Sequence, residues 1–140
     1  MKILFIRFSS IGDIVLTTST LRSLKKGIPN TQIHYLTLEE YAPFLEGHSS
    51  IDRLHLLERS TSISKLISVG NYLNNCKYDI IVDMHDSLRS KIIRNRIKSS
   101  SHHYLRKPRW KRFKLFEFHM FRIFFSDIFP LLTFRFQSCC

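Results

Sequence analysis

The residues with the clearest chemical potential follow a short apolar run at the start of the chain, in the segment Ser9-Ser10-Ile11-Gly12-Asp13. Two hydroxyls, a glycine and a carboxylate at a strand-to-helix turn suit the binding of a polar substrate by backbone N–H groups. Gly12 allows a positive φ or the close approach of a ligand. Asp13 has the chemistry of a general base that removes a proton from a hydroxyl. The alternative is that Asp13 or Ser10 only caps a helix.

The second pair of reactive side chains, Asp83 and His85, is separated by one residue at the end of an apolar run. Side chains two positions apart on a strand point to the same side, so a metal-binding pair is conceivable. Two ligands do not make a site, however, and the other histidines and cysteines show no recognisable zinc spacing. The sequence therefore predicts neither a metal nor a cofactor.

A strongly basic stretch with interleaved aromatic residues spans residues 106–114. Cations and aromatic rings together can neutralise phosphates and stack bases, so nucleic acid is one partner to consider. A phosphorylated glycolipid or an anionic membrane attracts the same cations, at about 1 kcal/mol per surface charge. A solvated face is the third interpretation, and nucleic acid is the least favoured because no recognisable nucleic-acid motif accompanies the stretch. The basic residues are Arg106, Lys107, Arg109, Lys111, Arg112 and Lys114.

Alternating strands and helices are predicted around these segments. Apolar patterns predict strands over residues 2–8, 32–38, 51–57 and 78–84, and helices over residues 14–26, 39–45 and 62–74. This alternation predicts an α/β fold, a Rossmann-like parallel sheet with helices on both faces. Ligands of such sheets lie beyond the carboxyl ends of the strands, which places residues 9–13 and 83–87 on the same edge.

The size, charge and cysteine content of the chain limit its class. A chain of 140 residues, 44% of them hydrophobic, has room for one packed domain. The formal charge of +11 points to a polyanionic partner. The three cysteines, two of them adjacent, do not suggest a disulfide framework. The apolar run before Arg7 is shorter than the roughly 7–15 residues of a signal peptide, and residues 123–136 are shorter than the roughly 20 of a transmembrane helix. These observations predict a cytoplasmic chain.

The pattern S-S-x-G-D-x-x-x-T, formed by residues 9–17, follows the first predicted strand. Further short motifs follow in order: Leu21 to Lys26 before Pro29, Tyr41-Ala42-Pro43-Phe44-Leu45, Ile51-Asp52-Arg53, Tyr78-Asp79, Asp83-Met84-His85 and Leu88-Arg89-Ser90. On these motifs, residues 1 to about 115 resemble glycosyltransferase family 9, the bacterial ADP-heptose:lipopolysaccharide heptosyltransferases. Ser19 departs from the pattern, because the family commonly carries proline there.

The resemblance implies a GT-B architecture of two Rossmann-like domains with the active site in the cleft between them. This chain matches the N-terminal half, which holds the acceptor, whereas the C-terminal domain binds the nucleotide-sugar donor, ADP-heptose. Asp13 matches the catalytic base of the family. Ser9, Ser10 and Gly12 match the acceptor-binding loop around it. His85 matches a stretch that borders the cleft on the acceptor side, and the alternative for this residue is a purely structural role. The implied acceptor is the lipopolysaccharide core or lipid A at the cytoplasmic face of the inner membrane, and no metal is needed.

These expectations divide the chain into a Rossmann-like acceptor-side domain over residues 1–104 and a basic, aromatic segment with an atypical tail over residues 105–140. The donor-binding domain is expected to be absent, because family members are more than twice this length. We therefore expect a truncated or frame-shifted gene, with the break between Phe118 and Ser126, and no transfer by the isolated chain. The alternative function is a basic anion-binding module without catalysis, with nucleic acid or an anionic membrane as its partner.

Overall fold

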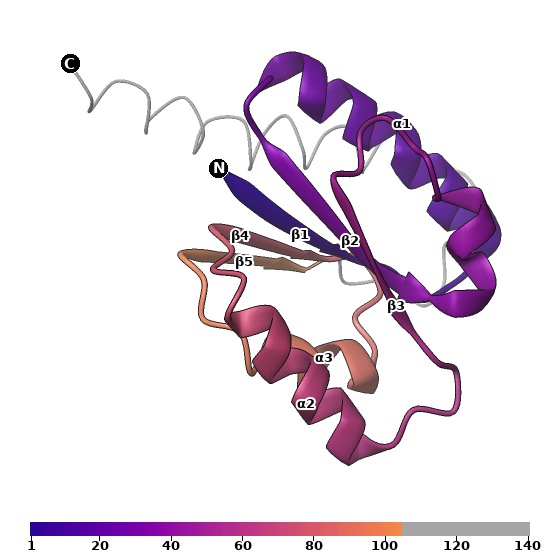
Figure 1. Cartoon of the computed structure of the whole chain (residues 1–140), viewed down its shortest axis with the longest axis vertical. Coiled ribbons are helices and arrows are strands. Elements are labelled where there is room, and N and C mark those ends of the chain that lie inside the picture. The colour runs from indigo at the N-terminus through magenta and orange to yellow at the C-terminus, as the bar shows by residue number, and fades with distance from the viewer. Residues whose placement is uncertain (105–140) are drawn as a thin grey trace, which may run out of the picture. The chain divides into compact units, whose positions relative to one another are not determined.

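A five-stranded parallel sheet with helices on both faces forms the part of the chain that the structure describes, residues 1–104 of a computed structural model (Figure 1). The predicted Rossmann-like α/β fold is therefore confirmed. The elements in chain order are β1 (Lys2–Ile6), α1 (Ile11–Gly27), β2 (Gln32–Leu38), the 3-10 helix η1 (Glu39–Phe44), β3 (Arg53–Leu57), α2 (Ile63–Asn74), β4 (Ile80–Asp83), α3 (Leu88–Arg94) and β5 (Ser101–Tyr104).

The strands are ordered β3-β2-β1-β4-β5, and every neighbouring pair is parallel. In the central strand β1, Phe5 is level with Tyr35 of β2 and with Val82 of β4. The chain therefore moves outward from β1 in one direction up to β3, returns, and moves outward in the other direction from β4 to β5.

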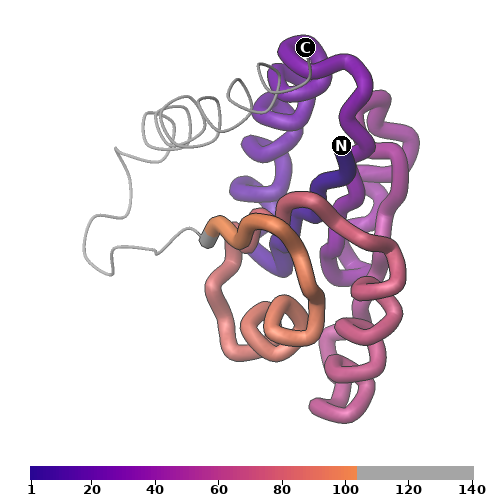
Figure 2. Tube along the Cα trace, turned by 90° about the vertical axis from the view of Figure 1, so that its left-hand side faces the viewer, coloured from indigo at the N-terminus to yellow at the C-terminus, as the bar shows by residue number. Residues whose placement is uncertain are grey.

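Side chains of β1 alternate between the two faces of the sheet. Leu4, Ile6 and Phe8 belong to a buried cluster that includes Leu66 and Leu73 of α2 and Ile93 of α3. The opposite face of β1, with Ile3, Phe5 and the following Arg7, therefore lies on the side of α1. Figures 1 and 2 show this separation, with α1 on one side of the sheet and α2 and α3 together on the other.

Helix α1 has the expected end signals, since Ser10 is its N-cap and Lys25 and Lys26 lie in its last turn. It begins at Ile11, three residues earlier than predicted, and this corrects the reading of residues 9–13 as a loop. Gly12 is consequently helical and does not use a positive φ, whereas Gly47 does, with φ of 72°. The buried residues, spaced three or four apart, are Ile14, Thr17, Leu21 and Leu24.

The helix α3 and the strand β5 had no counterpart in the sequence prediction. Helix α3 spans seven residues, and the sequence of β5 is Ser-His-His-Tyr, so neither carries a clear apolar period. Tertiary packing fixes α3 instead: a Cβ added at Gly70 of α2 would lie 2.8 Å from Cβ of Arg96 and 3.0 Å from the carbonyl oxygen of Ile93. Within residues 1–104, no helix is long and apolar enough to span a bilayer.

Candidate functional site

The central strands β1 and β4 are neighbours from which the chain departs in opposite directions, by way of α1 to β2 and by way of α3 to β5. Sheets of this type bind ligands in the crevice between two such loops, beyond the carboxyl ends of the strands. The loops here are residues 7–10 and 84–87. The sequence prediction that both polar segments lie at one edge of the sheet is therefore confirmed.

Asp13 lies in the first turn of α1, three residues after Ser10, in a capping-box arrangement. Its Oδ2 accepts a hydrogen bond from the backbone N–H of Ser10 at 3.3 Å, and its carbonyl oxygen accepts one from the Thr17 hydroxyl at 2.7 Å. A capping role is thus present. It does not exclude chemistry, because 24% of the Asp13 side chain remains exposed at the edge of the sheet.

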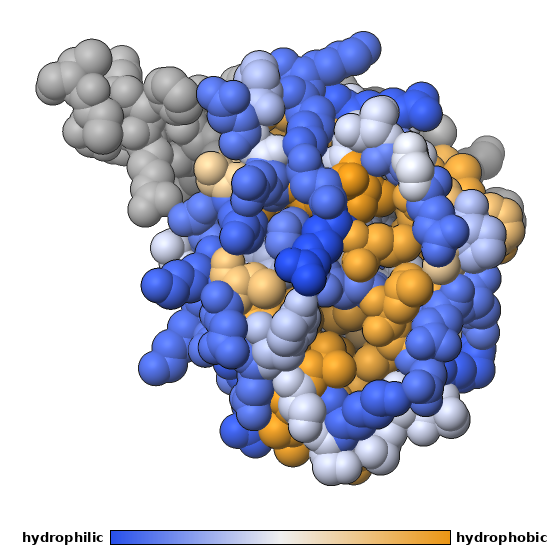
Figure 3. Space-filling view, in the orientation of Figure 1, coloured by the Kyte–Doolittle hydropathy of each residue, from blue (hydrophilic) through white to orange (hydrophobic). Residues whose placement is uncertain are grey.

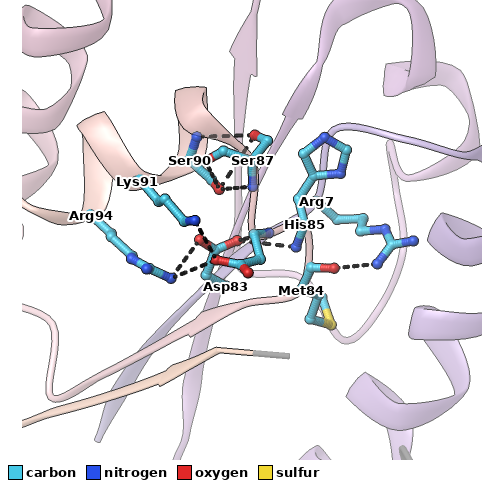
Figure 4. Close-up of polar contacts among 9 residues, drawn as sticks. Arg7, Asp83, Met84, His85, Ser87, Ser90, Lys91 and Arg94 are labelled. Carbon is cyan, nitrogen blue, oxygen red and sulfur yellow. Dashed lines mark hydrogen bonds and ion pairs between the residues drawn. The ribbon is translucent and has the colours of Figure 1, made fainter. Parts of the chain in front are cut away.

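Arg7 lies directly after β1 and is 1% exposed. Its Nε donates to the carbonyl oxygen of Ser9 at 2.6 Å. Its two terminal nitrogens donate to the carbonyl oxygen of Met84 and to the carboxylate of Asp13. One buried guanidinium therefore joins the loop after β1, the first turn of α1 and the loop after β4. Figure 4 shows the bond between Arg7 and Met84.

Burial lowers the pKa of Arg7, while electrostatic interactions with Tyr35 and Asp83 raise it. Arginine nevertheless stays protonated in proteins, so a permanent positive charge lies beneath the loop. This charge is paired with the adjacent Asp13 carboxylate. Burial also raises the pKa of the Tyr35 hydroxyl, which keeps Tyr35 neutral beneath the site.

The loop after β4 is held by Asp83, which is fully buried. Asp83 Oδ1 accepts hydrogen bonds from the backbone N–H groups of His85 and Asp86, both at 3.0 Å, and Oδ2 pairs with Arg94 of α3 at 3.0 Å. Figure 4 shows Arg94 and Lys91 of α3 pointing towards this loop. One carboxylate oxygen of Asp83 thus holds the loop backbone and the other pairs with Arg94, which removes Asp83 as a partner of His85 in a metal pair.

The His85 side chain turns towards the loop after β1. Its ring contacts Phe8 edge to face, with centroids 5.4 Å apart and an interplanar angle of 65°. Figure 4 shows His85 and Arg7 on the same side of the loop, away from α3. The side chain is partly exposed, and it follows β4 at the same edge of the sheet as Asp13. Among residues 1–104, no group of three or more His, Cys, Asp or Glu side chains is arranged to hold a metal ion.

Two curated bacterial proteins are similar to this chain. Lipopolysaccharide heptosyltransferase 1 of Campylobacter coli is 28% identical over 94 residues, which are 66% of this chain and 28% of that protein. Lipopolysaccharide heptosyltransferase 3 of Escherichia coli is 27% identical over 111 residues, which are 72% of this chain and 33% of that protein. No family model matches the chain. The chain thus spans a third or less of the length of these relatives.

Among solved structures, the glycosyl transferase family 9 protein of Veillonella parvula DSM 2008 matches with a TM-score of 0.69 at 27% identity, over 79% of this chain and 37% of that one. The chain contains a heptosyltransferase-like domain of the glycosyltransferase family 9 type. The predicted resemblance is therefore confirmed. The E. coli heptosyltransferase WaaC with ADP-2-deoxy-2-fluoro heptose shares the fold, with a TM-score of 0.69 at 16% identity over 89% of this chain and 47% of that one.

The heptosyltransferase-like domain brings five of the predicted site residues to one edge. Ser9 and Ser10 precede α1, Gly12 and Asp13 lie in its first turn, and His85 faces them from the neighbouring loop. A Cβ added at Gly12 would meet no atom of the described residues within 4 Å, so packing there does not require a glycine. The roles of these residues stay predictions. The six basic residues predicted between 106 and 114 lie outside the described residues.

The residue that the sequence interpretation missed is Arg7. Its signal was a cation directly after a run of apolar residues, in a segment predicted to be a strand buried on both faces. Charged side chains are rarely buried unless they are paired, so a charge at such a position indicates a partner elsewhere in the fold. The partners come from sequence positions as distant as Met84, which only the packing of β1 against β4 reveals.

Large apolar side chains are exposed beside the two loops of the heptosyltransferase-like domain. Ile11 and Val15 of α1 are 44% and 49% exposed, and Leu88 at the start of α3 is 74% exposed. On the face shown in Figure 3, apolar side chains also gather around the edge strand β3, where Leu56 is exposed. Apolar surface of this kind often marks a contact with another protein surface or a ligand.

Proposed function

We propose that this domain is the acceptor-side half of a heptosyltransferase-like glycosyltransferase and that Asp13 is its general base. The observation that carries the proposal is the position of the Asp13 carboxylate: it is partly exposed, paired with Arg7, and located at the reversal of the strand order where such folds bind ligands. The similarity to lipopolysaccharide heptosyltransferases supports the reaction class.

In the proposed reaction, an acceptor hydroxyl attacks the anomeric carbon of a nucleotide-activated heptose. The bond between that carbon and the diphosphate breaks as the new glycosidic bond forms, and ADP leaves. Asp13 accepts the proton of the attacking hydroxyl, for which it must lie within about 2.6–3.2 Å of the hydroxyl oxygen. Ser9, Ser10 and the open surface at Gly12 bind the acceptor from one side, and His85 binds it from the other.

The donor, ADP-heptose, is proposed to bind to a second Rossmann-like domain that would face this edge. The exposed Ile11, Val15 and Leu88 support a covering lobe at this edge, since a second domain would remove them from water. Transferases gain much of their rate by orienting the two substrates together. We therefore expect the 140-residue chain alone to bind acceptor without transferring sugar.

Acceptor binding can be tested on the chain itself. Heptose-free lipopolysaccharide core oligosaccharide, released from its acyl chains, is titrated into the isotope-labelled chain, and amide chemical shifts are recorded. We expect saturable shifts at residues 9–13 and 84–87, and none at His34 or His55 on the face of the sheet covered by α2. Saturable shifts confined to other regions, or no shifts at millimolar oligosaccharide, would contradict an acceptor site at this edge.

Transfer is tested by joining residues 1–104 to the donor-binding domain of the Veillonella relative and measuring heptose transfer from ADP-heptose to heptose-deficient lipopolysaccharide. We expect transfer by the joined protein and none by the 140-residue chain. Transfer by the chain alone would contradict the need for a second domain. A joined protein that binds both substrates but transfers nothing would contradict the proposed reaction.

The basic residues 106–114 are proposed to hold the protein at an anionic membrane surface that carries the lipopolysaccharide acceptor. Support comes from the net charge of +11 and from the local excess of Lys and Arg. Co-sedimentation with vesicles that contain anionic lipid is compared with binding to RNA of matched charge, at several salt concentrations. We expect stronger retention on vesicles, and stronger retention on RNA would favour the nucleic-acid alternative.

A further inference from the structure

The group that the proposed reaction leaves unexplained is the buried guanidinium of Arg7. Burying a cation costs free energy unless it is paired and hydrogen-bonded. Arg7 meets this requirement with acceptors from three separate segments: the Ser9 carbonyl, the Met84 carbonyl and the Asp13 carboxylate. A residue needed only to fill space on this face of β1 would be apolar, as Ile3 and Phe5 are.

The geometry of the Asp13 carboxylate depends on Arg7. Arg7 and the backbone N–H of Ser10 both donate to Oδ2, one from the interior and one from the helix start. These two contacts fix the orientation of the carboxylate on a helix whose first turn faces solvent. The planar guanidinium can hold a carboxylate and a carbonyl at once in fixed directions, which the single ammonium of a lysine does not do.

The same guanidinium reaches the second loop through the carbonyl oxygen of Met84. The backbone N–H of Met84 in turn donates to the carbonyl oxygen of Ile6 at 3.0 Å, and the next residue is His85, whose ring contacts Phe8. The side chain of Asp13 and the loop that carries His85 are therefore linked through one side chain, although they are separated by about seventy positions in the sequence.

We propose that Arg7 is a positioning residue that sets the orientation of the Asp13 carboxylate and couples it to the loop of residues 84–87, so that the base and His85 keep one relative position when an acceptor binds. This inference rests on the proposed role of Asp13 as the base. It assigns Arg7 no contact with substrate.

The test uses the isotope-labelled 140-residue chain without substrate and compares Arg7→Met, Arg7→Lys and Asp13→Asn. The readouts are the ¹³C shift of the Asp13 carboxyl carbon and the amide exchange rates of residues 84–86. In Arg7→Met we expect the Asp13 carboxyl resonance to move and amide exchange at residues 84–86 to rise by roughly tenfold or more. In Arg7→Lys we expect the carboxyl shift to be largely restored, because the charge remains, but not the protection of residues 84–86.

Asp13→Asn keeps Arg7 in place, so it tests the coupling even if Arg7→Met fails to fold. Asparagine can still accept a hydrogen bond from Arg7, but the ion pair is lost, so we expect exchange at residues 84–86 to rise by less than in Arg7→Met, although no bond joins Asp13 to that loop directly. Arg59→Met, which removes an exposed guanidinium paired with Glu40, is the matched control and should change neither readout.

Unchanged exchange at residues 84–86 in both Arg7→Lys and Asp13→Asn would overturn the coupling, and an unmoved Asp13 resonance in a folded Arg7→Met would overturn the positioning role. Because no substrate is present, these results are independent of the acceptor titration. A coupled Arg7 in a chain that binds no acceptor would count against the proposed function, whereas acceptor binding with uncoupled loops would count against this inference.

Discussion

Two polar clusters lie in the same parallel sheet, and their surroundings differ. The loop cluster, formed by Arg7, Asp13 and the carbonyl of Met84, lies at the carboxyl edge and includes a partly exposed carboxylate. The His–Tyr cluster, formed by His34 of β2, His55 of β3 and Tyr78 before β4, lies on the face of the sheet covered by α2.

The three side chains of the His–Tyr cluster contact one another through their polar atoms. Nδ1 of His34 is 2.9 Å from the Tyr78 hydroxyl and 3.2 Å from Nε2 of His55, and the hydroxyl is 3.3 Å from that same Nε2. Tyr72 of α2 packs edge to face on His55. The polar atoms thus join β2, β3 and the segment before β4, while the His55 ring packs on α2. The loop cluster instead presents a charged group to the edge where such folds bind ligands, so the place of a polar cluster in the sheet, more than its composition, separates chemistry from packing.

The largest expected effect on transfer comes from neutralising Asp13 in the joined two-domain protein. Asp13→Asn keeps an oxygen that can accept from Arg7 but removes the base, so we expect transfer to fall by about 10²–10⁴-fold. Asn is preferable to Ala, because Ala would leave the buried Arg7 with one acceptor fewer. The matched control, His55→Gln in the His–Tyr cluster, should retain the rate per folded molecule. Undiminished transfer by Asp13→Asn would remove Asp13 from its proposed role.

A substitution at Gly70 of α2 tests how closely α2 and α3 are packed. In Gly70→Ala, the added Cβ would lie 2.8 Å from Cβ of Arg96 and 3.0 Å from the backbone oxygen of Ile93. Backbone atoms cannot move aside cheaply, so the clash should exceed the helix-propensity gain of about 1 kcal/mol. We expect a net loss of about 1–3 kcal/mol in the free energy of unfolding, measured by urea denaturation. A more stable variant would show that α2 and α3 are packed less closely than described.

The pH dependence of stability probes the His–Tyr cluster. Burial lowers the pKa of His55 to about 4, with His34 and Arg53 adding to the effect. Burial, Lys2 and Arg53 lower the pKa of His34, and Asp52 opposes them. The unfolded chain, with ordinary histidine pKa values near 6.5, then binds more protons than the folded chain between about pH 6.5 and 4.

This part of the stability is therefore complete above about pH 6.5 and is lost as the pH falls towards 4. Urea midpoints at pH 7.5, 6.0 and 5.0 should decrease in that order. His55→Gln should reduce the slope, because glutamine does not titrate. An identical slope in that variant would show that other groups cause the acid sensitivity.

The smallest expected effect on folding is at Gly12, where a Cβ has open space around it, in contrast to Gly70. The space around its Cβ position is open, so Gly12→Ala should leave the unfolding free energy unchanged or raise it by less than about 1 kcal/mol. If the acceptor approaches the backbone there, the same variant should weaken binding of the core oligosaccharide in the titration. Full affinity in Gly12→Ala would leave the glycine without a role in acceptor binding.

Most strands and helices could be predicted from the sequence, and the errors in the prediction have identifiable causes. The strand predicted at residues 32–38 and the helix predicted at residues 62–74 lie within one residue of β2 and α2, because their apolar residues follow the spacing of a strand and of a helix. The start of α1 was placed too late, since Ile11 and Gly12 carry no buried side chain of their own to extend the apolar stripe. The short α3 and the polar β5 depend on neighbours that local patterns do not contain.

Three features could be predicted from the amino-acid sequence: the alternation of strands and helices, the S-S-x-G-D segment after the first strand, and the resemblance to glycosyltransferase family 9. Each of them depends only on local residue patterns and on their order along the chain. The burial of Arg7, its pairing with Asp13 and its hydrogen bond to the Met84 carbonyl are visible only in the tertiary structure. The physical reason is that a buried charge requires acceptors, and the packing of β1 against β4 brings those acceptors from distant parts of the chain.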